Sequence, residues 1–401
     1  PNIDRLAAEG MRFTDCYAGA TVCAPSRSCL ITGQHTGHTT VRSNSSTRTG
    51  ARVPLRAEDP SIAKVLKGPQ WRDGYDEDRA YATGMFGKWG LGEAGTSGEP
   101  NDHGFDEWFG FLNQQHAHSH YPEFLWRGKQ REVLPGNRDG GRKEYASDLF
   151  LREALYFIDR HTYEPFFLYL PFTVPHGRLE APDLAPYENE SWPEQEKTYA
   201  AMVTRLDGYV GRLMDKLREN GLDERTIVFF ASDNGGYFNF PLFGGNGKLR
   251  EKKGSVYEGG IRVPMIARWP GEIEPGVVSS HPWAFWDVLP TAAELTGATI
   301  PRNIDGISVL PVLLGQPPRD ADRPLYWESH TGRGFNQAAR MGNWKGVRHG
   351  LNGDLELYDL SKDEGESSNI AKAHPEVVRR MQEYLATARI DSAEYPVKNT
   401  A

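Results

Sequence analysis

The chain has 401 residues, and 46 Lys and Arg against 54 Asp and Glu give it a formal charge of −8. A hydrophobic content of 38% and a charged content of 25% are typical of a folded globular protein and exclude intrinsic disorder. The acidic balance argues against a broad nucleic-acid surface, but it allows a local cationic pocket for a small anion. The longest apolar stretch, residues 166–172, is far shorter than the roughly 20 residues of a membrane-spanning helix. We therefore expect no nucleic-acid partner and no membrane span.

The N-terminal region begins abruptly. Residue 1 is Pro rather than Met, and residues 3–11 already have the pattern of a helix, so we expect the natural N-terminus and any targeting segment to lie upstream. Three cysteines, Cys16, Cys23 and Cys29, follow within 14 residues of one another. An odd number of cysteines does not indicate a disulfide framework, which leaves one of them available for chemistry.

Hydrophobic periodicity predicts alternating strands and helices through most of the chain. Strands are expected at 80–86, 166–172, 226–231 and 263–267, and helices at 143–160 and 193–220, the second closed by Gly221. This alternation predicts a mainly parallel sheet flanked by helices. Residues 96–142 are rich in Gly, His and Trp and weakly periodic, so we expect a long functional loop region there rather than core.

The character of the sequence changes after residue 318. Short alternating stretches follow at 325–328, 337–341, 344–347 and 355–360, and then an amphipathic helix at 375–388. This pattern predicts a smaller α+β subdomain with an antiparallel sheet. We therefore expect a catalytic α/β domain over 1–318 and a C-terminal subdomain over 319–401.

The run from Cys23 to Gly33 has the features of a helix with a chemical function. Pro25 lies near the expected helix start and Gly33 at its stop, so the side chain of Cys23 would face free backbone N–H groups. Arg27 follows one turn later on the same side of the helix. This arrangement predicts an anion site, and its alternative is a half-buried structural Cys at a helix start.

The run Cys23-Ala24-Pro25-Ser26-Arg27 resembles the active-site signature of the type I sulfatases, members of the alkaline phosphatase superfamily in which this Cys is oxidised to formylglycine. Other motifs match this family in the right order, and the resemblance extends from the first residues to about 360. They are Gly87-Lys88-Trp89, Pro175-His176, Ser232-Asp233-Asn234-Gly235 and the turn from Lys253 to Gly260, followed by Arg262-Val263-Pro264. The resemblance implies an alkaline-phosphatase-like α/β domain that lacks its first strand.

Cleavage of a sulfate ester needs a nucleophile, charge neutralisation and a proton for the departing alcohol. A thiol would give a stable adduct, whereas a hydrated formylglycine has one hydroxyl to attack sulfur and a second to expel sulfate. The resemblance assigns this modification to Cys23. It also implies that Arg27, Lys88 and Lys253 surround the ester with positive charge, and that His176 faces the leaving-group oxygen together with Lys253. Each cation taken alone would be an ordinary surface residue.

Asp233 and Asn234 follow the strand expected at 226–231. The sequence Asp-Asn-Gly-Gly favours a turn in any protein, but these side chains are also hard oxygen ligands for Ca²⁺, with Mg²⁺ as the alternative ion. Two ligands do not hold such an ion, and the resemblance implies a further Asp pair on the first strand. We therefore expect roughly 20 to 40 residues, a strand plus a connection, to precede Pro1 in the natural protein.

The second signature departs from the family at Gly90, where a His that contacts sulfate is common. The substitutes that we consider are His116 and His118 in a His-rich segment, and His103. The alternatives for the His-rich segment are a solvated loop and an adventitious metal site. We select His116 and His118 as candidate substrate-binding residues.

Together these motifs predict a sulfatase that cleaves sulfate monoesters with formylglycine and Ca²⁺, on a sulfated small molecule or glycan. A formylglycine-generating maturation enzyme is an implied partner, and the resemblance implies a periplasmic or secreted location. Cys16 and Cys29 would remain thiols or pair with each other. Two alternatives stay open: a phosphonate or phosphodiester hydrolase of the same superfamily, and a glycan-binding pseudoenzyme.

Overall fold

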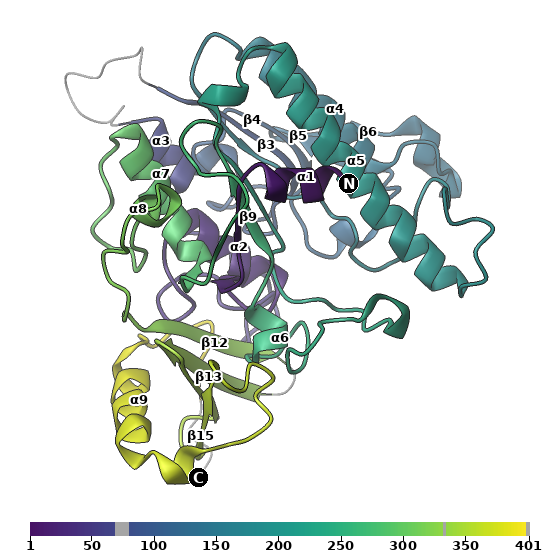
Figure 1. Ribbon diagram of the computed structural model, residues 1–401. Helices are drawn as coiled ribbons and strands as arrows, with labels where there is room; N and C mark the ends of the chain where they lie inside the picture. The colour runs from purple at the N-terminus through teal and green to yellow at the C-terminus, as the bar shows by residue number, and fades with distance from the viewer. Residues whose placement is uncertain (69–79, 332–333, 398–401) are drawn as a thin grey trace. The chain divides into compact units, whose positions relative to one another are not determined.

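The structure is a computed structural model that describes residues 1–68, 80–331 and 334–397 (Figure 1). Contacts divide the chain into two compact units, which we describe separately. Unit 1 contains Pro1–Gly10, Ala63–Val228 and Ala267–Gly276, and unit 2 contains Met11–Ile62, Phe229–Ile266 and Val277–Ala401. None of the helices within the described ranges is long and apolar enough to cross a membrane.

Unit 1 is built on a five-stranded sheet with the order β6-β5-β4-β3-β7. Strand β3 is parallel to both of its neighbours, β4 and β7, whereas β4, β5 and β6 pair antiparallel. The bounds are β3 Ala82–Lys88, β4 Glu107–Phe111, β5 Phe124–Arg127, β6 Gln130–Val133 and β7 Phe166–Tyr169.

Three of these strands lie within residues 96–142, so the expectation of a long loop region there is wrong. Phe109, Phe111 and Leu125 are buried in the core of unit 1. The hydrophobic pattern did not indicate β4 because this strand is only five residues long and nearly all buried. It therefore lacks the alternation of a half-exposed strand.

Helices α4 (Ala146–Arg160) and α5 (Glu194–Glu219) lie side by side in unit 1, as both ribbon views show. The apolar side chains of α4 pack on the sheet, and Gly84 of β3 allows the ring of Phe157 to approach closely. Both helices match their predicted positions to within three residues, and Gly221 follows α5 with a φ of +65°. The first helix, α1 (Asn2–Ala8), is shorter than predicted because Met11 begins a strand.

A second sheet has the order β10-β1-β9-β8, and β2 pairs with β11 in a separate parallel ladder. The bounds are β1 Met11–Phe13, β2 Cys16–Tyr17, β8 Val228–Ala231, β9 Met265–Arg268, β10 Val277–Ser279 and β11 Trp283–Ala284. Within unit 2, helix α2 (Cys23–Thr32) contacts α7 (Val288–Thr296). The shorter helices are α3 Ile62–Leu66, α6 Glu258–Ile261 and α8 Leu310–Leu313.

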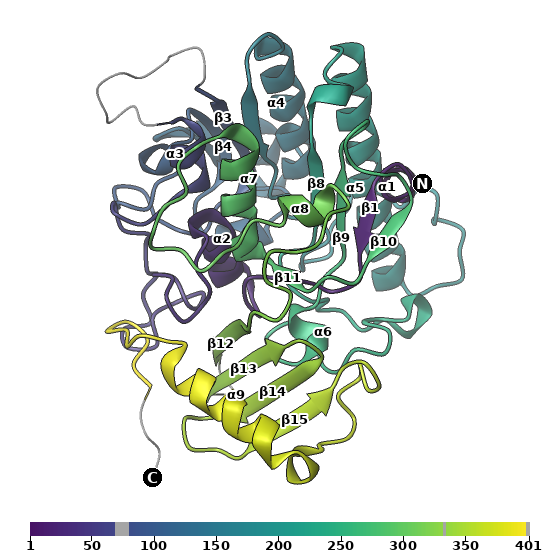
Figure 2. The same cartoon turned by 60° about the vertical axis from the view of Figure 1, so that its left-hand side comes forward.

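The C-terminal part of unit 2 is an antiparallel sheet of β12 (Leu325–Thr331), β13 (Gly334–Met341), β14 (Trp344–His349) and β15 (Leu355–Asp359). Helix α9 (Pro375–Thr387) lies across it in Figure 2 and buries Met381 and Leu385 there. These elements confirm the predicted α/β fold with a smaller antiparallel subdomain.

The C-terminal sheet also shares a core with the rest of unit 2. Trp327 packs against Tyr17, and its Nε1 donates a hydrogen bond to Ala18 O at 2.9 Å. The C-terminal residues therefore have a sheet of their own and a common core with earlier segments. The boundary at residue 318 stays a prediction.

Candidate active site

Cys23 is the first residue of α2, after the extended residue Val22. Its side chain is only 2% exposed, and nine of the ten residues of α2 are buried, so the packing of unit 2 fixes the helix. The helix ends at Gly33, whose φ of 70° is a conformation that glycine adopts without strain. The predicted helix and its stop are thus present, and residue 23 lies at the positive end of the helix dipole.

Two long-range contacts join the predicted residues of unit 2. Lys253 Nζ donates a hydrogen bond to Cys23 Sγ at 3.2 Å. Arg27, 6% exposed, donates from Nε and Nη2 to Asp233 Oδ2 at 3.2 and 2.8 Å. Residues more than 200 positions apart in the sequence therefore meet around the start of α2.

The turn after β8 is held against the turn that carries Lys253. Lys253 N donates to Gly236 O at 3.1 Å, and Gly235 N donates to Gly260 O at 3.0 Å. A Cβ at Gly235 would lie 1.9 Å from Gly259 O, so this approach of two backbones requires glycine. The two turns thus form one rigid wall beside α2.

Asn234 within this wall has an unusual environment. Its side chain donates from Nδ2 to Gly235 O at 3.0 Å, while the buried Oδ1 has no hydrogen-bond partner among the described residues. A buried oxygen without a partner costs about 1–3 kcal/mol. A hard cation bound here would satisfy this oxygen, so Asn234 and the neighbouring Asp233 fit a Ca²⁺ or Mg²⁺ site.

Unit 1 carries the other predicted residues. Lys88 is buried at the end of β3, and its backbone N–H donates to Pro171 O at 2.9 Å. The ring of His118 stacks on that of His176, with centroids 4.7 Å apart and planes 16° apart. His120, which sequence reasoning did not select, lies 3.1 Å from His176 O through its Nε2 and is fully buried. Two histidines, His118 and His120, therefore contact His176.

His116 lies in different surroundings from His118. Its ring contacts Phe111 and Phe124 at centroid distances of 4.9 and 4.4 Å. Burial among these rings lowers the pKa of His116 to about 4, so its imidazole is neutral over the physiological range. These contacts are those of a packing residue. His103 is also buried, with Nε2 3.0 Å from Ser97 O.

Gln114 occupies the space where a side chain at Gly90 would begin. Gly90 has a φ of +81°, and a Cβ there would lie 1.9 Å from Gln114 Nε2. The Gln114 side chain is 3% exposed, and its Oε1 is buried without a hydrogen-bond partner in the described ranges. Sequence reasoning missed Gln114 because nothing local indicates that it faces Gly90.

A buried ion cluster includes Glu258, which follows the turn that carries Lys253. Lys345 Nζ on β14 is 2.7 Å from Glu258 Oε1 and 3.3 Å from Glu366 Oε1, and all three side chains are fully buried. Glu258 begins α6, and its N–H donates to Glu366 Oε2 at 2.7 Å. Burial raises the pKa of Glu366 to about 7. No sequence pattern indicates this cluster, because Lys345 and Glu366 stand in segments where charged side chains are usually exposed.

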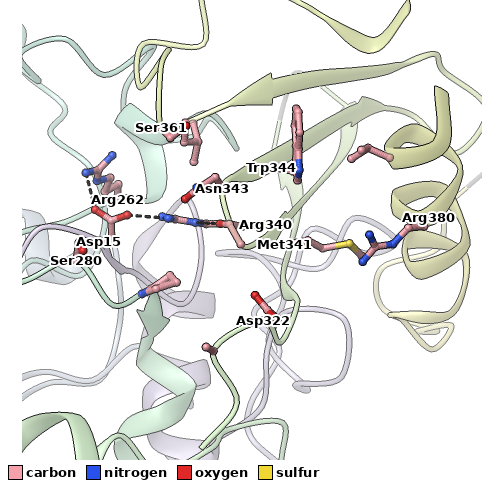
Figure 3. Close-up of a pocket in the computed structure, with 15 residues that line it drawn as sticks. Asp15, Arg262, Ser280, Asp322, Arg340, Met341, Asn343, Trp344, Ser361 and Arg380 are labelled. Carbon is pink, nitrogen blue, oxygen red and sulfur yellow. Dashed lines mark hydrogen bonds and ion pairs between the residues drawn. The ribbon is translucent and has the colours of Figure 1, made fainter. Parts of the chain in front are cut away.

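A cavity of about 710 Å³ elsewhere in unit 2 contains none of the predicted site residues (Figure 3). On its wall the carboxylate of Asp15 bridges Arg262 and Arg340, with both N–O distances at 2.7 Å. Because the carboxylate is held between two guanidinium groups, we assign these three residues a structural role. All three cysteines are buried thiols, and Cys16 and Cys29 do not form a disulfide.

Comparison with known proteins bears on this geometry. The family model described as "Sulfatase" matches residues 1–298. The chain belongs to the sulfatase family. A second model, "N-sulphoglucosamine sulphohydrolase, C-terminal", matches residues 249–391 of this sulfatase. The membership predicted from the motifs is confirmed.

Named relatives agree with this assignment. The sulfatase is 34% identical to N-acetylgalactosamine-6-sulfatase of Sus scrofa over 86% of this chain and 66% of that protein. It is 32% identical to arylsulfatase A of Homo sapiens over 98% of this chain and 83% of that protein. The solved structure of Ps i-CgsB in complex with k-i-k-neocarrahexaose is 29% identical, with a TM-score of 0.82 over 100% of this chain and 90% of that one. The chain spans about two thirds of the length of the N-acetylgalactosamine-6-sulfatases that it matches.

Proposed function

We propose that this sulfatase hydrolyses sulfate monoesters on a carbohydrate, with residue 23 as the nucleophile after its conversion to formylglycine. The contact between Lys253 Nζ and Cys23 Sγ at the start of α2 carries the proposal. It places a cation against the predicted nucleophile at a helix end that favours anions. The names of the relatives, which include an N-acetylgalactosamine-6-sulfatase and a protein solved with a neocarrahexaose, support a sulfated glycan as substrate.

The residues of unit 2 have separate tasks in this proposal. The N–H groups of Ala24 and Ser26 donate to Asn44 Oδ1 and Val22 O, so the expectation of free N–H groups at this helix end is wrong. The dipole of α2 and the buried guanidinium of Arg27 would instead stabilise negative charge on the sulfate oxygens. Lys253 holds a proton at Nζ for the departing alcohol. A hydrated aldehyde at residue 23 would supply the attacking hydroxyl group.

Asp233 and Asn234 would hold Ca²⁺, with Mg²⁺ as the alternative ion. The partnerless Oδ1 of Asn234 supports this assignment. Bound there, a divalent cation would withdraw charge from a sulfate oxygen. Arg27 keeps the Asp233 carboxylate in place through its two hydrogen bonds, which orients one member of the ligand pair.

The family resemblance assigns further roles in this proposal to residues of unit 1. Lys88 would add a second cation for the sulfate, and His176 would face the leaving-group oxygen together with Lys253, which supplies its single proton. We assign His118 as the substitute for the His missing at position 90, because it stacks on His176 whereas His116 packs between phenylalanines. A maturation enzyme that converts Cys23 is the proposed partner, and the proposed location is the periplasm or the exterior.

Mass spectrometry of the peptide around residue 23 tests the nucleophile. The protein is produced with a formylglycine-generating enzyme, and we expect residue 23 to lose sulfur and two hydrogens and gain one oxygen. The same preparation is assayed on 4-nitrophenyl sulfate and 4-nitrophenyl phosphate, with Cys23→Ala as the inactive control. A larger kcat/KM for the phosphate ester would assign the chain to phosphoester chemistry. An unmodified thiol that binds sulfated glycans without turnover would make it a pseudoenzyme.

A further inference from the structure

An uncharged loop rich in aromatic residues follows Asp233 and Asn234, the candidate metal ligands. Residues 235–247 contain no Asp, Glu, Lys or Arg, although the chain as a whole carries a charge of −8. Three of its large side chains are exposed to solvent: Tyr237 by 58%, Leu242 by 48% and Phe243 by 39%. Several exposed apolar side chains in one short segment mark a binding surface more often than a chance arrangement.

The rings of this loop contact one another in sequence. Tyr237 meets Phe238 edge to face at 5.1 Å, Phe238 stacks on Phe240 at 5.2 Å with planes 4° apart, and Phe240 meets Phe243 at 6.3 Å. We call Tyr237, Phe238, Phe240 and Phe243 the aromatic row. Because each ring packs on the next, the apolar surface is preorganised, and a ligand would not have to order it on binding.

The aromatic row starts at the candidate active site of unit 2. Gly236, immediately before Tyr237, accepts the hydrogen bond from Lys253 N. Lys253 Nζ in turn contacts Cys23 Sγ, and Lys252 Nζ lies 5.2 Å from the centroid of the Tyr237 ring. A molecule held by its sulfate at residue 23 would therefore have the aromatic row next to it.

We propose that the aromatic row is a subsite for the sugar residues that flank the sulfated one, so that the substrate is an oligosaccharide rather than a free sulfated monosaccharide. This inference rests on the proposed function. The faces of pyranose rings carry C–H groups that stack on aromatic rings, and such stacking removes apolar surface from water. The absence of acidic side chains from 235–247 avoids repulsion of further sulfate groups along the chain.

Chain-length dependence tests the subsite. Matched di- and hexasaccharides from chondroitin 6-sulfate, heparin and carrageenan are used as competitors against 4-nitrophenyl sulfate. Those oligosaccharides from which the protein releases sulfate are also assayed as substrates. For at least one glycan, we expect the hexasaccharide to bind at least tenfold more tightly than the disaccharide. Tyr237→Ala and Phe243→Ala should remove this gain, with a loss on the hexasaccharide at least tenfold larger than any loss on 4-nitrophenyl sulfate. Tyr163→Ala, which removes a fully exposed tyrosine of unit 1, is the matched control and should keep the gain.

The outcomes separate the subsite from the activity. Absence of turnover of 4-nitrophenyl sulfate by matured protein would contradict the proposed function itself. Two results would overturn only the subsite. One is turnover of 4-nitrophenyl sulfate with equal affinity for the di- and hexasaccharides of all three glycans. The other is tighter binding of the hexasaccharide that persists in both Tyr237→Ala and Phe243→Ala. Light scattering of the wild type and both variants provides the last check: a dimer that Tyr237→Ala and Phe243→Ala convert to a monomer would show that a second copy covers the aromatic row, and would overturn the proposal.

Discussion

At position 90 the space that a side chain would occupy is taken by Gln114, which is 24 residues away in the sequence. Gly90 has a positive φ, and the amide of Gln114 lies where its Cβ would be. A residue with a side chain at position 90 would therefore meet two penalties, backbone strain and displacement of a buried amide. Glycine at position 90 is therefore required by the backbone conformation and by the position of Gln114.

Replacement of this glycine separates the two penalties. Gly90→Ala is compared with Gly95→Ala, since Gly95 has nearly the same φ, +79°, but open space around its Cβ position. We expect Gly95→Ala to cost about 1–2 kcal/mol from backbone strain, and Gly90→Ala to cost more because it also displaces Gln114. Thermal unfolding measures both. Equal decreases in Tm would show that Gln114 moves aside without cost.

His118 and His116 should respond differently to truncation. We expect His118→Ala to lower kcat/KM on 4-nitrophenyl sulfate more than tenfold, because its ring stacks on His176, to which we assign the leaving-group oxygen. His116→Ala should instead lower Tm, because it leaves a cavity between Phe111 and Phe124. Steady-state kinetics and thermal unfolding of both variants make the comparison. A large kinetic effect at His116 with wild-type kinetics for His118→Ala would reverse the assignment.

At the scale of elements, the turn that carries Lys253 is held between the Asp-Asn turn after β8 and the C-terminal sheet. Backbone hydrogen bonds join it to Gly236, and Glu258 joins it to Lys345 on β14 and to Glu366. Lys345 lies between the two buried carboxylates, and Glu258 has a further ion pair with Arg262 at 3.6 Å. Burial raises the pKa of Glu366 to about 7. The charge of the cluster that anchors this turn therefore depends on pH near 7.

Glu366→Gln makes this dependence measurable. The pKa of Glu366 is raised from 4.5 to about 7, so between these values the folded chain retains a proton that the unfolded chain releases. The stability from this proton is fully present below about pH 4.5 and is lost as the pH rises through 7. Gln does not ionise and keeps an oxygen to accept the Glu258 N–H, so the Tm of the wild type should fall relative to this variant between pH 5 and pH 8. Parallel curves of Tm against pH would contradict the assignment.

At the scale of the whole molecule, the three cysteines lie within one unit and all are buried thiols. Burial raises the pKa of Cys16 and of Cys29 well above the usual range, which suppresses the reactive thiolate. The thiols of Cys16 and Cys29 should therefore be inert in the folded protein. After unfolding, the number of thiols reports both the modification of Cys23 and the absence of a disulfide.

A thiol titration with Ellman's reagent measures the number of thiols before and after unfolding. We expect no rapid reaction of the native protein and, in denaturant without reductant, two thiols per chain when Cys23 is converted, since three cysteines less one leaves two. Cys23→Ala gives the same two and calibrates the assay. Three thiols in the denatured wild type would mean that Cys23 is unconverted, and none would mean that Cys16 and Cys29 are paired.

The sequence by itself determined the family, the chemistry-bearing turns and the order of most elements. Cys23 with Arg27, and Asp233 with Asn234, lie close in the chain, so helix geometry and turn propensity place each pair locally. Long amphipathic segments such as α5 are predicted well because many residues repeat the same period.

Only the tertiary structure decided which distant residues meet. The contact of Lys253 with Cys23, the stacking of His118 on His176 and the filling of Gly90 by Gln114 depend on how separate strands and turns approach one another. Strand β4 escaped prediction because residues buried on both faces lose the alternation that identifies a strand. Strands β5 and β6 have only four residues each, which is too short for a clear period. Periodicity records which face of an element is buried, but it does not record which partner covers that face.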